Sequence, residues 1–129
     1  MSILLDTHVF IWAAGGERRL SPAATALLED SNEVIFLSAV SSWEISIKWS
    51  KGSLELPQPP GIFIREAIAN AGISQLAITV DDSCVVADLP FHHRDPFDRL
   101  LIAQARSNGL RIFSSDPVFK KYEVDVFWL

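Results

Sequence analysis

Short apolar runs alternate along this chain with longer stretches in which apolar residues recur every three or four positions. The short runs predict strands buried on both faces, and the longer stretches predict amphipathic helices. Ser21-Pro22 and Asp95-Pro96 mark two helix starts, and glycines mark several helix ends. The predicted strands span residues 2–6, 33–37, 76–79, 111–113 and 124–128. The predicted helices span residues 7–14, 22–30, 39–50, 62–70 and 96–108. One more helix is predicted between residues 70 and 96, with Asp81 or Asp82 as its cap and Pro90 at its end.

This alternation predicts an α/β fold with a parallel sheet, covered on both faces by right-handed crossovers. In such sheets, ligands bind outside the carboxyl ends of the strands. A length of 129 residues without repeat or linker predicts one domain over residues 1–129. The hydrophobic content of 49% agrees with a sheet that is buried on both faces.

Four acidic residues stand where a predicted strand ends or a predicted helix begins. Asp6 ends the first strand, and Glu44 lies early in the helix after the second strand. Asp98 lies in the first turn of the helix over residues 96–108, and Asp116 follows the fourth strand. The carboxyl ends of parallel strands share one edge, so these carboxylates are expected to gather there. Because adjacent carboxylates repel one another, the cluster indicates a hard divalent cation such as Mg²⁺ or Mn²⁺.

Two of these acids also have an ordinary structural explanation. Asp6 could cap the helix over residues 7–14 through its carboxylate. Glu44 could form an ion pair with Lys48 one helical turn later, a contact that contributes a few tenths of a kcal/mol.

The other two acids have capping explanations of their own. Asp95, Pro96 and Asp98 form a good helix start by themselves, so capping and chemistry remain equal alternatives for Asp98. Asp116 precedes Pro117 and could cap the following turn. A metal site is therefore predicted only from the convergence of the four acids.

Charge, cysteine and histidine content narrow the possibilities further. A net charge of −5, from 11 basic and 16 acidic residues, argues against nucleic-acid binding by bulk attraction, although bound metal would offset much of it. The single cysteine, Cys84, excludes an internal disulfide and is expected at a buried helix position. His92 and His93 lack zinc-site spacing and are expected as solvated loop residues. With no apolar run of membrane length and no leader, the protein is expected to be soluble and cytoplasmic.

Four segments together resemble the PIN-domain ribonucleases, and most of all the VapC-type toxins of bacterial toxin–antitoxin pairs. They are LLDTH at residues 4–8, SAVSSWEI at 38–45, RDPFDRLLIAQA at 94–105 and SSD at 114–116. The resemblance covers nearly the whole chain. It implies a three-layer α/β/α sandwich with a five-stranded parallel sheet, an RNA substrate, a homodimer, and a cognate antitoxin whose C-terminal segment occupies the active site.

The same resemblance implies roles for individual residues. The metal ligands and catalytic acids are Asp6, Glu44, Asp98 and Asp116; Asp95 is a secondary candidate, and Thr7, Ser38 and Ser115 would orient water or phosphate through their hydroxyls. Candidates for holding substrate phosphate are Arg99, Lys48 and Arg94. Hydrolysis by a water that Mg²⁺ or Mn²⁺ activates would leave a 5′-phosphate and a 3′-hydroxyl.

Two other readings of the sequence remain. An aspartate-based phosphatase or phosphotransferase would use Asp6 as its nucleophile, but such enzymes usually carry a second aspartate where this chain has His8. A non-catalytic binding module would need the acids only as helix caps. Stabilisation by Mg²⁺ or Mn²⁺ separates a true acidic cluster from a set of caps.

Overall fold

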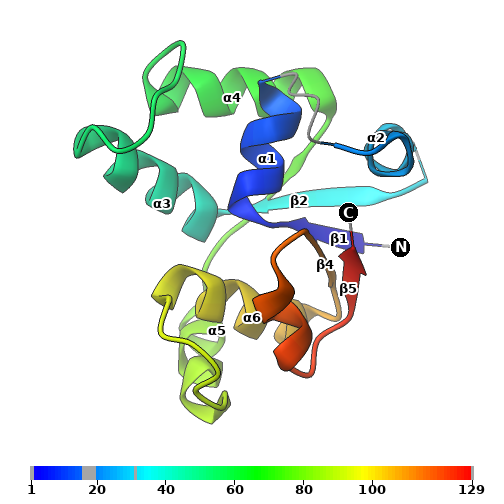
Figure 1. Cartoon of the computed structure of the whole chain (residues 1–129), viewed down its shortest axis with the longest axis vertical. Coiled ribbons are helices and arrows are strands. Elements are labelled where there is room, and N and C mark those ends of the chain that lie inside the picture. Colours follow the sequence, from blue (N-terminus) through cyan, green and yellow to red (C-terminus); the bar gives the residue numbers. More distant parts are fainter. Residues whose placement is uncertain (1, 16–19, 31, 129) are drawn as a thin grey trace.

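The protein forms one five-stranded parallel sheet, flanked by helices, in a computed structural model that describes residues 2–15, 20–30 and 32–128. The strand order is β3-β2-β1-β4-β5, so the first strand lies at the centre (Figure 1). The strands are β1 (Ser2–Leu5), β2 (Val34–Ser38), β3 (Ser74–Leu76), β4 (Arg111–Ser114) and β5 (Val126–Trp128). Each neighbouring pair is parallel, which confirms the predicted α/β fold and its five-stranded sheet.

Helices cover both faces of this sheet. Figure 1 shows α1, α2 and α4 on one side and α5 and α6 on the other, with α3 extending from the carboxyl edge. The helices are α1 (Thr7–Ala14), α2 (Pro22–Glu29), α3 (Ala39–Ser50), α4 (Pro60–Ala71), α5 (Val80–Val85) and α6 (Pro96–Asn108). Two short 3₁₀ segments, η1 (Val86–Asp88) and η2 (Pro117–Lys121), follow α5 and β4.

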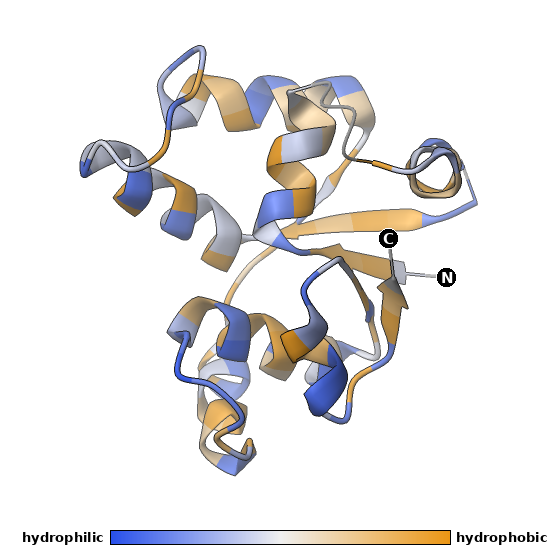
Figure 2. Cartoon of the chain, in the orientation of Figure 1, coloured by the Kyte–Doolittle hydropathy of each residue, from blue (hydrophilic) through white to orange (hydrophobic). Residues whose placement is uncertain are grey.

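Two hydrophobic cores lie on opposite faces of the sheet because successive side chains of a strand point in opposite directions. In β1, Ile3 and Leu5 pack into the core under α1 and α4, which includes Phe10 and Phe63. Leu4 packs into the other core, which α6 completes. All three β1 side chains have no exposed surface. Figure 2 shows β2 as almost continuously hydrophobic, the pattern of a strand covered on both faces.

Most predicted elements occur with small boundary shifts. The third strand spans residues 74–76 instead of 76–79 because Thr79 is drawn into the start of α5. The Thr79 hydroxyl accepts the Asp82 N–H, while the Asp82 carboxylate accepts the Thr79 N–H. This reciprocal capping box makes Thr79 the cap, so the expectation of Asp81 or Asp82 as cap is wrong.

Three other elements differ in length or composition. Helix α4 begins at Pro60, two residues before the predicted start, with the proline ring in its first turn. The segment before Pro90 is α5 followed by the 3₁₀ turn η1. The fifth strand begins at Val126, two residues after its predicted start. Gly15 caps α1 as expected, while Gly16 lies outside the described residues.

Cys84 is exposed on α5, so the prediction of a buried cysteine is wrong. The apolar residues beside it misled that prediction, since α5 is a short surface helix of six residues. Within the part of the chain that the structure describes, no helix combines the length and apolarity needed to cross a bilayer.

Candidate active site

The strand order creates one place where a site is expected. From β1 the chain continues to β2 and β3 on one side of the sheet, then crosses to β4 and β5 on the other. Such a reversal leaves a crevice outside the carboxyl ends of the two strands between which it occurs, here β1 and β4. Asp6 follows β1 directly and Asp116 follows β4 after one residue. Glu44 lies in the second turn of α3, which begins where β2 ends, and Asp98 lies in the first turn of α6.

Asp6 is buried at this edge and is not a helix cap. It occupies the cap position of α1, but its carboxylate accepts no hydrogen bond from the helix. Its Oδ2 instead accepts a hydrogen bond of 2.7 Å from the hydroxyl of Ser114, and its side chain is 4% exposed. Burial raises the pKa of Asp6, and the bond from Ser114 opposes that rise. The capping explanation therefore fails for this residue.

Ser114 links the first acid to the last. Its Oγ donates to Asp6 and accepts the backbone N–H of Asp116 at 3.0 Å. The sheet register explains the contact, because Leu5 pairs with Phe113 and the next residues of the two strands are therefore neighbours. The carboxylate of Asp116 accepts the N–H of Val118 at 3.0 Å and is otherwise exposed, so its capping role is real.

Glu44 combines an ion pair with an unsatisfied oxygen. Its side chain is 3% exposed, and its Oε2 lies 2.5 Å from Nζ of Lys48, as the one-turn spacing predicts. The hydrogen bond to Glu44 raises the pKa of Lys48 and keeps the ammonium charged. The second oxygen, Oε1, is buried without a hydrogen-bond partner. Buried carboxylate oxygens rarely lack a hydrogen-bond partner, so Oε1 is expected to bind a ligand.

Asp95, and not Asp98, caps α6. The Asp95 carboxylate accepts the N–H groups of Phe97 and Asp98, at 2.9 and 3.1 Å. The pKa of Asp98 is raised to about 8, chiefly by burial and then by the charges of Asp95, Asp6, Glu44 and Asp116, in that order. The choice between capping and chemistry for Asp98 is thus decided against capping.

The four acids share one electrostatic neighbourhood. All of the other three act on the pKa of Asp98, and Glu44 also acts on that of Asp6. Among the described residues, no three histidine, cysteine or acidic side chains stand close enough together to hold one ion as they are arranged. The donor set nevertheless fits a hard cation, because it consists of mutually repelling carboxylates with a buried, unpartnered oxygen on Glu44.

The structure gives the predicted hydroxyl residues different roles. The Thr7 hydroxyl donates to Oγ of Ser41 at 2.8 Å, and the residue is 3% exposed. Ser38 caps α3 by accepting the Val40 N–H, donates to Oε1 of Gln104 and has no exposed surface. Both hydroxyls therefore already donate hydrogen bonds inside the protein, and their role toward water or phosphate stays a prediction. Ser115 is half-buried after β4, where nothing tests its role.

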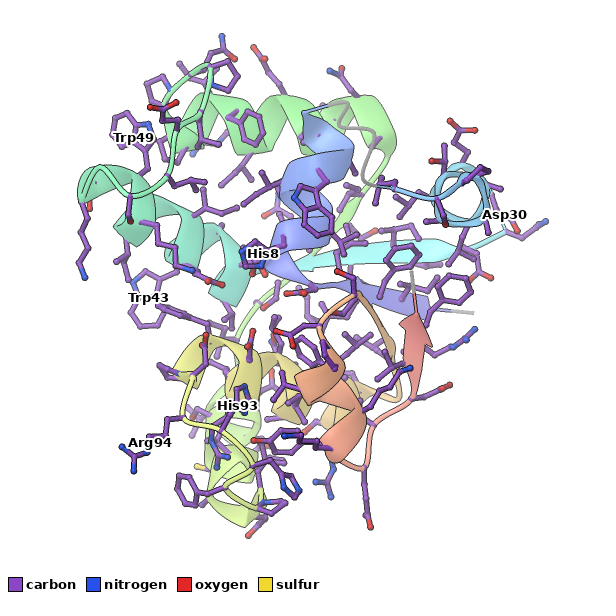
Figure 3. All side chains as sticks on the ribbon, viewed as in Figure 1. His8, Asp30, Trp43, Trp49, His93 and Arg94 are labelled. Carbon is purple, nitrogen blue, oxygen red and sulfur yellow. The ribbon has the colours of Figure 1, made fainter. Side chains whose placement is uncertain are left out.

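Arg99 is a structural residue, which corrects its expected role as a phosphate ligand. It is 3% exposed, and its guanidinium donates to backbone carbonyls of the preceding loop and to Oη of Tyr122. Arg94 is exposed, and Figure 3 shows it pointing away from the loop while its neighbour His93 points inward. Lys48 and Arg94 thus remain the basic candidates near the acids.

Sequence reasoning missed three residues at this site: Ser114, His93 and Tyr122. Ser114 could have been found from the register of β1 and β4, because the positions after Leu5 and Phe113 must adjoin. His93 is not a solvated loop residue, since its Nε2 lies 3.3 Å from Oδ2 of Asp98 and its Nδ1 lies 2.7 Å from Oη of Tyr122. Burial lowers the pKa of His93 and favours the neutral ring.

Comparison with known proteins gives matches along nearly the whole chain. The family model of the PIN domain matches residues 3–125. The ribonuclease VapC22 of Mycobacterium tuberculosis is 28% identical over 116 residues, which cover 89% of this chain and 87% of that protein. The structure of VapBC2 from Rickettsia felis, bound to a promoter DNA fragment, superimposes with a TM-score of 0.78 at 13% identity, covering 100% and 99% of the two chains. VapC20 of M. tuberculosis, a toxin that cleaves the sarcin–ricin loop, gives 0.57 at 18% identity, with 92% and 93% covered.

Proposed function

The chain belongs to the PIN-domain family, and from this premise we propose that it is a metal-dependent endoribonuclease, the toxin of a type II toxin–antitoxin pair. One observation carries the proposal: the carboxylates of Asp6 and Glu44 are both buried at the carboxyl edge of the sheet, and Oε1 of Glu44 has no hydrogen-bond partner there. Neither of these two carboxylates caps a helix. The ribonuclease relative VapC22 supports RNA as the substrate.

Asp6, Glu44, Asp98 and Asp116 would hold Mg²⁺ or Mn²⁺, with Asp95 as a further candidate. A divalent cation bound there would offset the carboxylate repulsion, lower the pKa of an attacking water and stabilise charge on the leaving oxygen. Before the cation binds, the protein itself fixes two of these ligands. The Ser114 hydroxyl holds one oxygen of Asp6, and the Lys48 ammonium holds one oxygen of Glu44.

The basic side chains would bring RNA to this edge. Lys48 is 41% exposed while bound to Glu44, so its ammonium can also meet a phosphate. Arg94 stands exposed in the loop before α6 and can make bidentate contact with phosphate oxygens. The net charge of −5 leaves the rest of the surface unattractive to RNA, so binding depends on these local cations and on the bound metal.

A cognate antitoxin and a second copy of the chain are the proposed protein partners. Complexes of toxin and antitoxin, such as VapBC2 from Rickettsia felis, share this fold and support the first. Exposed apolar side chains on α3 and α4, namely Trp43, Trp49 and Ile62, support burial of this surface in a complex. Light scattering of the purified chain, alone and with the co-expressed antitoxin, tests both partners.

Cleavage of RNA by the purified protein tests the catalytic proposal. A pool of tRNA and rRNA is incubated with Mn²⁺, with Mg²⁺ or with EDTA, and the wild type is compared with Asp98→Asn. Asp81→Asn, which removes an exposed acid from α5, is the matched control. Discrete fragments with 5′-phosphates are expected from the wild type and the control with metal, and none with EDTA or from Asp98→Asn.

Two results would contradict the proposal in different ways. Wild-type cleavage that persists in EDTA but is absent from Asp98→Asn would exclude a metal requirement. A chain that neither cleaves RNA nor melts at a higher temperature with Mn²⁺ would have no metal site, and the binding-module reading would replace the enzyme.

A further inference from the structure

A chain of three side chains leads from the interior of the protein to Asp98. Arg99 donates from Nη1 to Oη of Tyr122 at 3.2 Å. Oη lies 2.7 Å from Nδ1 of His93, and Nε2 of the same ring lies 3.3 Å from Oδ2 of Asp98. The backbone N–H of His93 also donates to Oη of Tyr122, at 3.3 Å.

The positions of the hydrogens in this chain follow from counting donors and acceptors. Oη of Tyr122 already receives two N–H groups, from Arg99 and from the backbone of His93, and neither nitrogen can accept. The phenolic hydrogen must then go to Nδ1 of His93, the remaining neighbour of Oη. Nδ1 is therefore the acceptor, so a neutral imidazole carries its hydrogen on Nε2 and donates it to Asp98.

We propose that His93 is a positioning residue, locked by Tyr122 and Arg99 in its Nε2–H tautomer, that holds Oδ2 of Asp98 and leaves Oδ1 to bind the metal. This inference rests on the proposed function, because it assigns Asp98 to the metal site. Hydrogen bonds from neighbouring side chains commonly orient the groups that ligate a metal. Here one such bond would fix which oxygen of Asp98 faces the other acids.

The two residues behind the His93 ring are buried and hydrogen-bonded. Tyr122 is 4% exposed and packs edge-on against His92, with ring centroids 4.8 Å apart. Arg99 also donates to the carbonyl of Pro90 at 2.8 Å and to that of Leu89 at 3.2 Å, which pins the loop that carries His93. The three side chains thus connect the end of η2, the loop before α6 and the first turn of α6.

The tautomer can be tested without metal or RNA. Long-range ¹H–¹⁵N correlation spectra of the metal-free protein near pH 8 distinguish a ring protonated on Nε2 from one protonated on Nδ1. His93 is expected to carry its hydrogen on Nε2 in the wild type and to show a mixture of tautomers in Tyr122→Phe. A wild-type ring with its hydrogen on Nδ1 would overturn the inference.

The positioning role is tested by Mn²⁺ affinity, measured by calorimetry on His93→Gln and His93→Asn. The glutamine amide can replace the Nε2 donor, whereas the shorter asparagine reaches only the Nδ1 position. We expect Mn²⁺ binding to weaken about 10- to 100-fold in His93→Asn, and to remain within about threefold of the wild type in His93→Gln. Tyr122→Phe keeps the ring packing and should fall between them.

The outcomes separate this inference from the proposed function. If the wild type binds Mn²⁺ and all three variants bind it equally well, His93 has no positioning role, although the metal site stands. If the wild type binds no Mn²⁺, the metal site itself is wrong, and the positioning role is lost with it. Equal melting temperatures of the metal-free His93→Asn and His93→Gln variants would show that their difference in affinity is not one of folding.

Discussion

The two sides of the acid cluster are built in different ways. On the strand side, Asp6 and Asp116 are joined through Ser114, and backbone pairing sets their positions: the N–H of Asp6 donates to the carbonyl of Phe113 at 3.0 Å. On the helix side, Glu44 and Asp98 depend on long side chains, Lys48 and His93. The strand side is therefore fixed by the fold, whereas the helix side can be adjusted by single substitutions.

The two sides are expected to respond differently to a bound metal ion. A carboxylate held by a neutral hydroxyl, as Asp6 is, keeps its full negative charge available to a cation. A carboxylate held by an ammonium, as Glu44 is, already has part of its charge offset. Lys48 and a metal ion thus compete for the negative charge of Glu44, whereas the Ser114 hydroxyl and a metal ion can bind the Asp6 carboxylate together.

The largest expected effect comes from neutralising one acid on each side. Asp6→Asn and Glu44→Gln should each lower kcat/KM for RNA cleavage by roughly 10³-fold or more, because transition-state stabilisation by a metal is worth several kcal/mol. Cleavage assays with the folded variants measure the loss. The control is Asp30→Asn, because Asp30 is the C-cap of α2 and lies away from the acids (Figure 3). Full activity of Glu44→Gln would show that the helix side is purely structural.

The second effect is a pH dependence of the metal-free protein. The pKa of Asp98 is about 8 in the folded chain and near 3.8 when unperturbed, so between these values the folded state holds a proton that the unfolded state has lost. The free energy of unfolding should therefore fall as pH rises from near 3.8 toward 8. Thermal melts across this range should show the slope, which Asp98→Asn reduces. An unchanged slope in that variant would assign the titration to another group.

The third effect concerns the strand side alone. Ser114→Ala removes the donor to Asp6 and the acceptor of the Asp116 N–H, and should cost about 1–3 kcal/mol of stability. Ser115→Ala, one residue later, is the matched control and should change stability little. Urea denaturation measures both. Equal losses in the two variants would mean that the bond to Asp6 contributes nothing particular.

The smallest effect sharpens the comparison from the helix side. Lys48→Met removes the cation that competes for Glu44, so the metal-free protein should lose up to about 1 kcal/mol of stability. Mn²⁺ should then bind roughly two- to fivefold more tightly, because one repelling charge is gone. Calorimetry checks the gain. Weaker binding would show that Lys48 holds Glu44 in the geometry that the metal needs.

The sequence predicted best what depends on strand order. Residues that follow parallel strands must reach the same edge, so the neighbourhood of Asp6 and Asp116 followed from two apolar runs. The hydroxyl that binds Asp6 did not follow: no contact with Asp6 was predicted for Ser114, which the register places beside it. A one-residue difference decides which face a side chain occupies, and apolar pattern alone does not set register between distant strands.

The sequence predicted least what depends on the path of loops. Arg99 follows Asp98 at a helix start, which is a typical place for an exposed cation. Its guanidinium is nevertheless buried, because it donates hydrogen bonds to backbone carbonyls of residues 86–90. His93 turns inward because Tyr122, 29 residues away in sequence, offers it a partner. Neither arrangement has a periodic signature, since both depend on where an irregular segment folds back.

The site can form only late in protein synthesis, because β1, at the centre of the sheet, pairs with β4, which is made much later. Asp6 leaves the ribosome before its partner Ser114, which lies 108 residues later in the sequence, and before the acid Asp116. At about 5–20 residues per second, roughly 5 to 20 seconds separate the synthesis of the two halves of the strand side. A nascent chain that lacks β4 therefore carries three of the four acids without the strand that places Ser114 beside Asp6, and we expect it not to cleave the RNA of the ribosome that makes it.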